Sequence, residues 1–118
     1  MSQFISLQQA IDMTTLYRKE KENILAPEYK NKNILCRSET FNRDVFDSVL
    51  AQEGCRGLRI YYGMDESLQV HAIVVGVNEK NEDMLPSAVL ATEGGDPGII
   101  ENGARCPEEC PEESPLNP

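Results

Sequence analysis

The residues whose types and spacing come closest to a chemical site are Cys106 and Cys110, in the sequence CPEEC. Their C-x-x-x-C spacing differs from the C-x-x-C of thioredoxin-like redox sites and zinc knuckles. The glutamates around them, among them Glu108 and Glu109, disfavour a reactive thiolate, because nearby negative charge raises the pKa of a thiol. The same carboxylates favour a divalent cation. We therefore expect a structural or incidental pairing of the two cysteines, with a metal site and a redox site as the alternatives.

Two further cysteines, Cys36 and Cys55, could complete a four-sulfur zinc site with that pair. Structural zinc sites usually bring their ligands in close pairs, however, and these two cysteines stand alone. Cys55 follows the end of a predicted helix, where a small core residue is the simpler interpretation. No phosphate-binding glycine loop and no hydrolase or zinc-protease motif occurs in the sequence, so we predict no cofactor.

His71 is the only histidine of the chain. A general base needs a nucleophile or a carboxylate within hydrogen-bond reach, and no motif supplies one near His71. A structural histidine on a strand is the favoured interpretation. The alternative is a small enzyme with a cleft around His71, Tyr61 and Arg59.

Composition restricts the partners. The chain has 118 residues, enough for one domain, and a formal net charge of -9. Such a charge argues against binding to nucleic acid and to an anionic membrane surface. No apolar run approaches the roughly 18 residues that span a bilayer, and the N-terminal residues lack the features of a signal peptide. We expect an acidic, cytoplasmic protein whose cysteines are thiols or metal ligands by default.

The elements that must position these residues are two helices followed by strands. Ser6 and Gln9 form a capping box, and apolar residues then recur at helical spacing to about residue 22. A second helix begins after Asn42, with Phe41 and Phe46 as a hydrophobic staple and Val45, Val49 and Leu50 as its buried stripe, and it ends at Gly54. The period then changes to two: we predict strands at residues 58–62, 70–77 and 88–91, with a loop at 63–68 and a short extended piece at 34–36.

This order of elements predicts an α+β fold, in which two N-terminal helices pack on one face of a three-stranded antiparallel meander. The nearly unbroken aliphatic run of residues 70–77 indicates a central strand. A four-residue loop would place Ile60 opposite His71, and one face would then contain Leu58, Ile60, Tyr62, His71, Ile73, Val75 and Val77. The other face is predicted to be an interface, because no helix is left to cover it; its residues are Arg59, Tyr61, Val70, Ala72 and Val74.

The last 26 residues have a different composition. Residues 93–118 contain seven acidic residues and one basic residue, a net charge of -6, together with five of the seven prolines and four of the eight glycines. So few large aliphatic residues cannot offset the entropy of ordering this segment. We therefore predict a single domain at residues 1–92 and an irregular acidic tail at 93–118, held by the domain or a neighbouring chain through Ile99 and Ile100.

Three segments together resemble a family of small bacterial proteins that has no assigned activity. They are GCRGLRIYYG at residues 54–63, the strand end VVGV at residues 74–77, and CPEEC followed by SPLN at residues 106–117. The resemblance implies a single-domain unit and transfers no catalytic residue.

These observations favour a non-enzymatic interaction module that forms a homodimer through the open sheet face. The runner-up is a metal- or thiol-carrying protein that uses Cys106 and Cys110, and the third reading is the small enzyme near His71.

Overall fold

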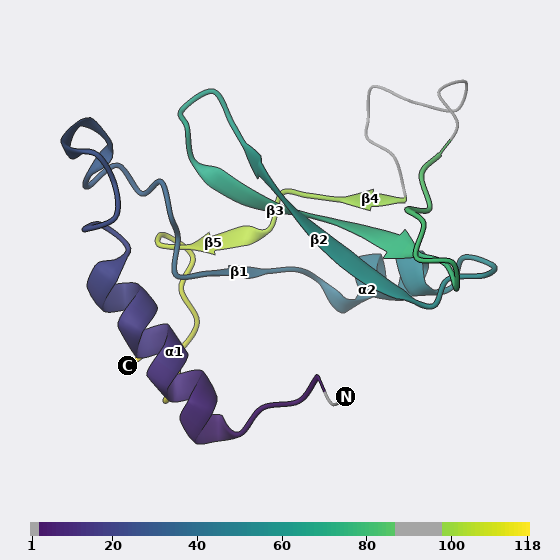
Figure 1. The fold of residues 1–118 in the computed structure, drawn as a ribbon, viewed down its shortest axis with the longest axis horizontal. Coiled ribbons are helices and arrows are strands. Elements are labelled where there is room, and N and C mark those ends of the chain that lie inside the picture. Colours follow the sequence, from purple (N-terminus) through teal and green to yellow (C-terminus); the bar gives the residue numbers. More distant parts are fainter. Residues whose placement is uncertain (1–2, 87–97) are drawn as a thin grey trace. The chain divides into compact units, whose positions relative to one another are not determined.

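A computed structural model describes residues 3–86 and 98–118 (Figure 1). The chain divides into two compact units. One consists of Met1–Ser38 and Arg105–Pro118, and the other of Glu39–Ala104. Strands β1 (Ser38–Thr40) and β5 (Ala104–Cys106) form a two-stranded sheet, and each contains the point at which the chain passes from one unit to the other. No helix among the described residues is long and apolar enough to cross a membrane.

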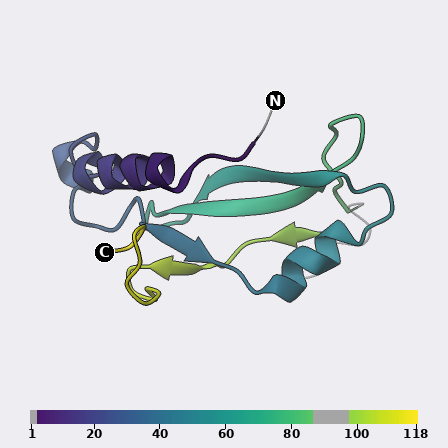
Figure 2. The same ribbon diagram turned by 90° about the horizontal axis from the view of Figure 1, so that it is seen from below.

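The unit Glu39–Ala104 is built on a three-stranded antiparallel sheet of β2 (Gly57–Met64), β3 (Val70–Val77) and β4 (Ile99–Ile100). The strand order is β2-β3-β4, which can be followed in Figures 1 and 2. The prediction that residues 70–77 form the central strand is confirmed. The strand predicted at residues 88–91 and the domain boundary predicted after residue 92 lie outside the described residues.

Helix α2 (Arg43–Leu50) packs against β3 and β4. The core of this unit consists of Val49, Val74 and Ile100, with Phe41, Phe46 and Leu58 packed around it. The predicted staple is present, since the rings of Phe41 and Phe46 stack with centroids 5.7 Å apart. Two details differ from the prediction. The side chain of Asn42 makes no capping hydrogen bond. Of the three residues of the predicted buried stripe, Val49 is buried, whereas Val45 and Leu50 are exposed.

Gly76 allows this close approach of helix and sheet. A β-carbon at Gly76 would lie 3.0 Å from Sγ of Cys55 and 3.2 Å from Cγ1 of Val49. Both distances are below ordinary van der Waals contact, so a side chain here would require Val49 and Cys55 to shift by a few tenths of an ångström. Cys55, predicted to be a small core residue, is half-buried beside Gly76, and its thiol donates a hydrogen bond to the carbonyl of Gly57.

The other unit contains helix α1 (Leu7–Glu20) and the short 3₁₀ helix η1 (Pro27–Tyr29). The predicted capping box of Ser6 and Gln9 is present in both directions. No residue of α1 is buried; the unit instead buries Ile34 and Cys106.

Polar contacts to backbone carbonyls tie this unit together. Tyr17 Oη donates to the carbonyl of Cys36 at 2.5 Å, and Lys21 Nζ donates to that of Leu35 at 3.0 Å. Burial raises the pKa of Tyr17. Arg105 donates to the carbonyls of Asn33 and Ile34 at 3.0 and 3.2 Å.

The α+β class is thus present, but the finer prediction needs four corrections. The two helices expected on one face of the sheet belong to different units, and only α2 is in the unit of the three-stranded sheet. The extended piece expected at residues 34–36 is not a strand, and β1 lies instead at Ser38–Thr40. The tail expected to be irregular contains β4 and β5. The hairpin loop begins two residues later than predicted, because β2 continues through Gly63 to Met64.

Candidate functional site

The hairpin register decides which side chains share a face of the sheet. Ile60 pairs with Val74, and His71 pairs with Gly63, not with Ile60 as predicted. The shift from the predicted register is an odd number of residues, so it moves every β3 side chain to the opposite face. One face, which we call the helix face because α2 covers part of it, consists of Leu58, Ile60, Tyr62, Met64, Val70, Ala72, Val74 and Gly76. The other, which we call the polar face, includes Arg59, Tyr61, His71, Ile73, Val75 and Val77.

The predicted interface residues therefore do not lie together. Arg59 and Tyr61 are on the polar face, whereas Val70, Ala72 and Val74 are on the helix face. Val74 is 1% exposed, because it packs in the core with Val49. The prediction failed because it assumed a four-residue loop, and the actual loop has five residues, 65–69.

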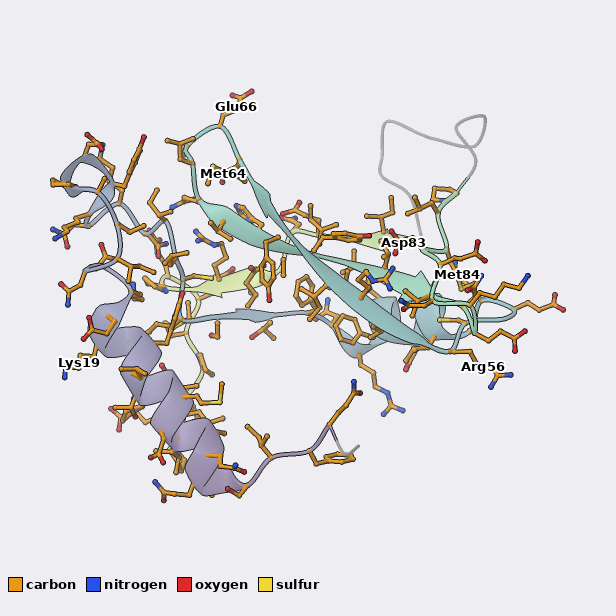
Figure 3. All side chains as sticks on the ribbon, in the orientation of Figure 1. Lys19, Arg56, Met64, Glu66, Asp83 and Met84 are labelled. Carbon is orange, nitrogen blue, oxygen red and sulfur yellow. A yellow bond between two sulfur atoms is a disulfide. The ribbon has the colours of Figure 1, made fainter. Side chains whose placement is uncertain are left out.

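The helix face bears an exposed apolar stripe along β2. Its residues are Ile60, Tyr62 and Met64, which are 55%, 79% and 59% exposed. Ala72 pairs with Tyr62 and Val70 with Met64, so these two half-buried residues continue the apolar surface onto β3. Figure 3 shows Met64 near the hairpin tip. The stripe is a row of large apolar side chains on a strand that has one neighbour in the described sheet.

The backbone N–H and C=O groups of β2 also alternate in direction along the strand, pointing in turn toward β3 and toward the open edge. The amide of Asp65 donates to the carbonyl of Gln69 at 3.1 Å, so the odd-numbered residues of β2 form the hydrogen-bonded pairs with β3. The other edge of β3 agrees with this pattern. There the even-numbered residues Ala72 and Gly76 bond away from β2, to Glu39 Oε1 at 2.8 Å and to the amide of Met84 at 2.9 Å. The even-numbered residues of β2 consequently direct their N–H and C=O groups to its open edge.

A hydrogen-bonded cluster lies at one end of the polar face. The guanidinium of Arg59 forms an ion pair with Asp83, and the hydroxyl of Tyr61 donates to the same carboxylate. Arg59 also donates to the side chain of Asn81 at 2.5 Å. Since Arg59 pairs with Val75 on β3, and Asp83 is bridged to β3 at Val77, the ion pair extends across this strand. Figure 3 shows Asp83 beside β3, away from the hairpin tip.

This cluster shifts the ionisation of its members. The hydrogen bond from Tyr61 and the charge of Arg59 hold the pKa of the Asp83 carboxyl below its ordinary value. The same carboxylate raises the pKa of Tyr61 and of Arg59. Arg59, Tyr61 and Asp83 are thus all engaged in hydrogen bonds to one another, and the side chains of Arg59 and Asp83 are partly covered. The apolar residue Val75 lies on the same face, opposite Arg59, and is 2% exposed although α2 lies on the other face.

His71 lies in a second cluster on the polar face. Its Nε2 is 2.7 Å from Oδ2 of Asp65, and its Nδ1 is 3.3 Å from Oε1 of Glu101. The His71 hydrogen bond is the main cause that lowers the pKa of Asp65, whose carboxylate also accepts from the amides of Ser67 and Gln69. The contact with His71 therefore joins the hairpin loop to β3.

A cavity of about 220 Å³ adjoins this histidine. Its lining consists of Gly63, Met64, Asp65, His71, Ile73 and Glu101. Among the described residues, this lining contains the imidazole of His71 and the carboxylates of Asp65 and Glu101, and no hydroxyl, thiol or amine. Arg59 and Tyr61 share the polar face with His71, as the enzyme hypothesis requires, but both are engaged with Asp83.

A larger cavity of about 540 Å³ lies beside the start of α2. Its lining, as far as the described residues form it, includes the carboxylates of Asp44 and Glu101 and no basic side chain. This charge does not favour an anion such as a phosphate, which proteins bind with Arg, Lys and helix N-termini.

The structure joins Cys106 and Cys110 in a disulfide, with Cα atoms 4.4 Å apart. Cys36 and Cys55 are free thiols in different units. No three histidine, cysteine, aspartate or glutamate side chains of residues 3–86 and 98–118 are grouped to hold a metal ion.

Comparison with models of protein families, with curated proteins and with solved structures gave no match. The family resemblance of residues 54–63, 74–77 and 106–117 stays a prediction.

Sequence reasoning missed Asp65, Asp83 and Glu101 as partners of the polar face, and Ile60, Tyr62 and Met64 as the exposed stripe. Alternation alone places Ile60, Tyr62 and Met64 on one face of β2. What the sequence does not indicate is that α2 packs against β3 and β4, whereas the stripe lies on β2 and is exposed.

Proposed function

We propose that this protein is a non-enzymatic interaction module that forms a homodimer through the helix face of its sheet. The observation that carries the proposal is the stripe of Ile60, Tyr62 and Met64, large apolar side chains that are each more than half exposed. A contiguous row of this kind is typical of a contact surface, whereas scattered exposed apolar residues are ordinary. Aromatic residues and methionine are enriched in such surfaces.

The local charge of the stripe is compatible with a second copy as the partner. The chain has a net charge of -9, so two copies repel each other over most of their surface. The strand β2 contains no acidic residue, and its one charged side chain, Arg59, is paired with Asp83 on the polar face. The stripe is therefore a surface on which the two chains can meet without opposing carboxylates.

The alternative functions have less support. A metal or thiol carrier would need the sulfurs of Cys106 and Cys110, which are joined to each other. An enzyme near His71 would have to use the imidazole or the carboxylates of Asp65 and Glu101, and both carboxylates lie against His71 itself.

A matched pair of variants tests the proposal. Tyr62→Arg places a charge in the stripe, and Ile24→Arg places the same charge on another exposed apolar residue, Ile24, which is 72% exposed. Sedimentation equilibrium of the wild type should give twice the mass of one 13.2 kDa chain. We expect Tyr62→Arg to raise the dissociation constant on the order of tenfold or more, and Ile24→Arg to leave it unchanged. A wild type that sediments as a single chain at 100 µM would refute the proposal, as would equal effects of the two variants.

A further inference from the structure

The geometry points to the way in which the second copy binds: two β2 strands pair edge to edge, antiparallel, so that two three-stranded sheets become one six-stranded sheet. This inference rests on the proposed function and deepens it, because the proposed function requires only that the stripe take part in the contact between the two copies. The inference names the edge of β2 as the contact and main-chain hydrogen bonds as its basis.

The first argument is that the same residues offer both backbone hydrogen bonds at the open edge and apolar side chains on the helix face. Leu58, Ile60, Tyr62 and Met64 direct their backbone groups to the open edge, as the Asp65–Gln69 hydrogen bond establishes. Their side chains form the helix face, and the last three of them are the exposed stripe. A strand added at this edge would therefore satisfy the free backbone groups and at the same time place the stripes of the two copies side by side, as cross-strand pairs on one face.

The second argument is that the edge is unprotected. Native edge strands are usually shielded by proline, lysine, a bulge or a very short length. β2 is eight residues long, its pairing with β3 is continuous from Gly57 to Met64, and it contains neither proline nor lysine. Its one charged side chain, Arg59, is held on the polar face by Asp83.

The third argument is that β2 is complementary to itself. A two-fold axis beside Tyr61 places Ile60 opposite Tyr62 of the second copy, and Leu58 opposite its Met64. These pairs are the outward-facing residues, so each can exchange two hydrogen bonds, about eight in all. On the polar face Arg59 then meets Gly63 of the second copy, and like charges do not face each other. A register two residues away, centred on Ile60, loses one of these pairs.

Residue 60 allows a selective test. The amide of Ile60 faces the open edge, so Ile60→Pro removes no hydrogen bond between β2 and β3, and proline is tolerated on edge strands. Ile60→Val is the matched control, because valine has the same number of side-chain carbons as proline and keeps the amide. We expect Ile60→Pro to raise the dimer dissociation constant on the order of 100-fold, and Ile60→Val to change it less than about fivefold. Circular dichroism of both variants checks that the hairpin is retained.

Cysteine cross-linking tests the register in the Cys36→Ser, Cys55→Ser background. The Tyr61 pair would be a non-hydrogen-bonded pair, with Cα atoms about 4.5 Å apart, within the range of a disulfide. Tyr61→Cys should therefore form a covalent dimer under mild oxidation, and Tyr62→Cys should not.

The outcomes separate the two proposals. A monomeric wild type contradicts both the dimer and the edge pairing. A dimer that Tyr62→Arg weakens but that folded Ile60→Pro leaves intact supports the proposed function and overturns the edge pairing. A dimer that Ile60→Pro dissociates, cross-linked through position 61, supports both; cross-linking through position 62 instead overturns the stated register.

Discussion

The amide of Asp65 lies 3.1 Å from the carbonyl oxygen of Gln69, and this hydrogen bond closes the five-residue loop between β2 and β3. The carboxylate of Asp65 accepts from the amide of Gln69 as well, at 3.0 Å. Because hydrogen-bonded pairs alternate along an antiparallel ladder, this closing pair fixes the direction of every backbone group in β2. The loop thereby determines which residues face the open edge.

Asp83 should make the stability of the protein sensitive to acid. Its pKa is lowered from the ordinary value of 3.8, first by the hydrogen bond from Tyr61 and then by Arg59. A carboxyl with a lowered pKa in the folded state contributes stability that is present above its unfolded pKa and lost as the pH falls through the folded one. We expect the melting temperature to fall with pH below about 4, and Asp83→Asn to reduce that slope while lowering stability at pH 7. An unchanged slope in Asp83→Asn would contradict this role.

Gly76 should tolerate substitution far less well than Gly57. A β-carbon at Gly76 would meet Cys55 and Val49 beneath α2, whereas at Gly57 it would lie 3.5 Å from Cγ2 of Val77, an ordinary contact. We expect Gly76→Ala to lower the free energy of unfolding by about 1–3 kcal/mol and Gly57→Ala to change it by less than about 0.5 kcal/mol. Urea denaturation of the two variants checks this. Equal losses would mean that α2 does not pack closely against Gly76.

In urea denaturation, Phe46→Ala should destabilise the protein much more than Asn42→Ala. The ring of Phe46 is half-buried, stacks on Phe41 and packs against the core of Val49, Val74 and Ile100. Phe46→Ala should therefore cost about 2–3 kcal/mol, less than a fully buried ring. Asn42 occupies the N-cap without a side-chain hydrogen bond, so Asn42→Ala should cost less than about 0.5 kcal/mol. A larger loss for Asn42→Ala would contradict the cap geometry.

The disulfide should stabilise the unit that contains α1. Cys106 and Cys110 close a short loop, for which the chain-entropy relation gives about 2 kcal/mol. Cys110→Ser removes the bond at its exposed end and leaves the buried Cys106 in place. We expect a loss of about 2 kcal/mol in urea denaturation. A reductant should produce the same loss in the wild type and no further loss in Cys110→Ser.

Local patterns in the sequence predicted the elements better than their pairing. The capping box of Ser6 and Gln9, the stacked rings of Phe41 and Phe46, and the central strand at residues 70–77 all follow from interactions within a few residues or from continuous burial. The register did not follow, because it depends on the length of one loop, and an odd error moves all of β3 to the other face.

The two strands within the acidic tail were missed for a related reason. Ile99, Ile100 and the residues of β5 have little signal of their own, and they become strands because β3 and β1 offer them edges. Long-range pairing of this kind cannot be read from local composition. The contacts of Asp83 and Glu101 with the polar face were missed for the same reason, because they too join residues far apart in the sequence.

Residue-resolved amide hydrogen exchange in β2, measured over a range of protein concentrations, tests the central claim most directly. The amides of Arg59, Tyr61 and Gly63 face β3 and should be protected at every concentration. Those of Ile60, Tyr62 and Met64 face the open edge, and we predict that their protection rises with concentration as the dimer forms. Fast exchange of these three amides at concentrations up to 1 mM would contradict self-association through β2.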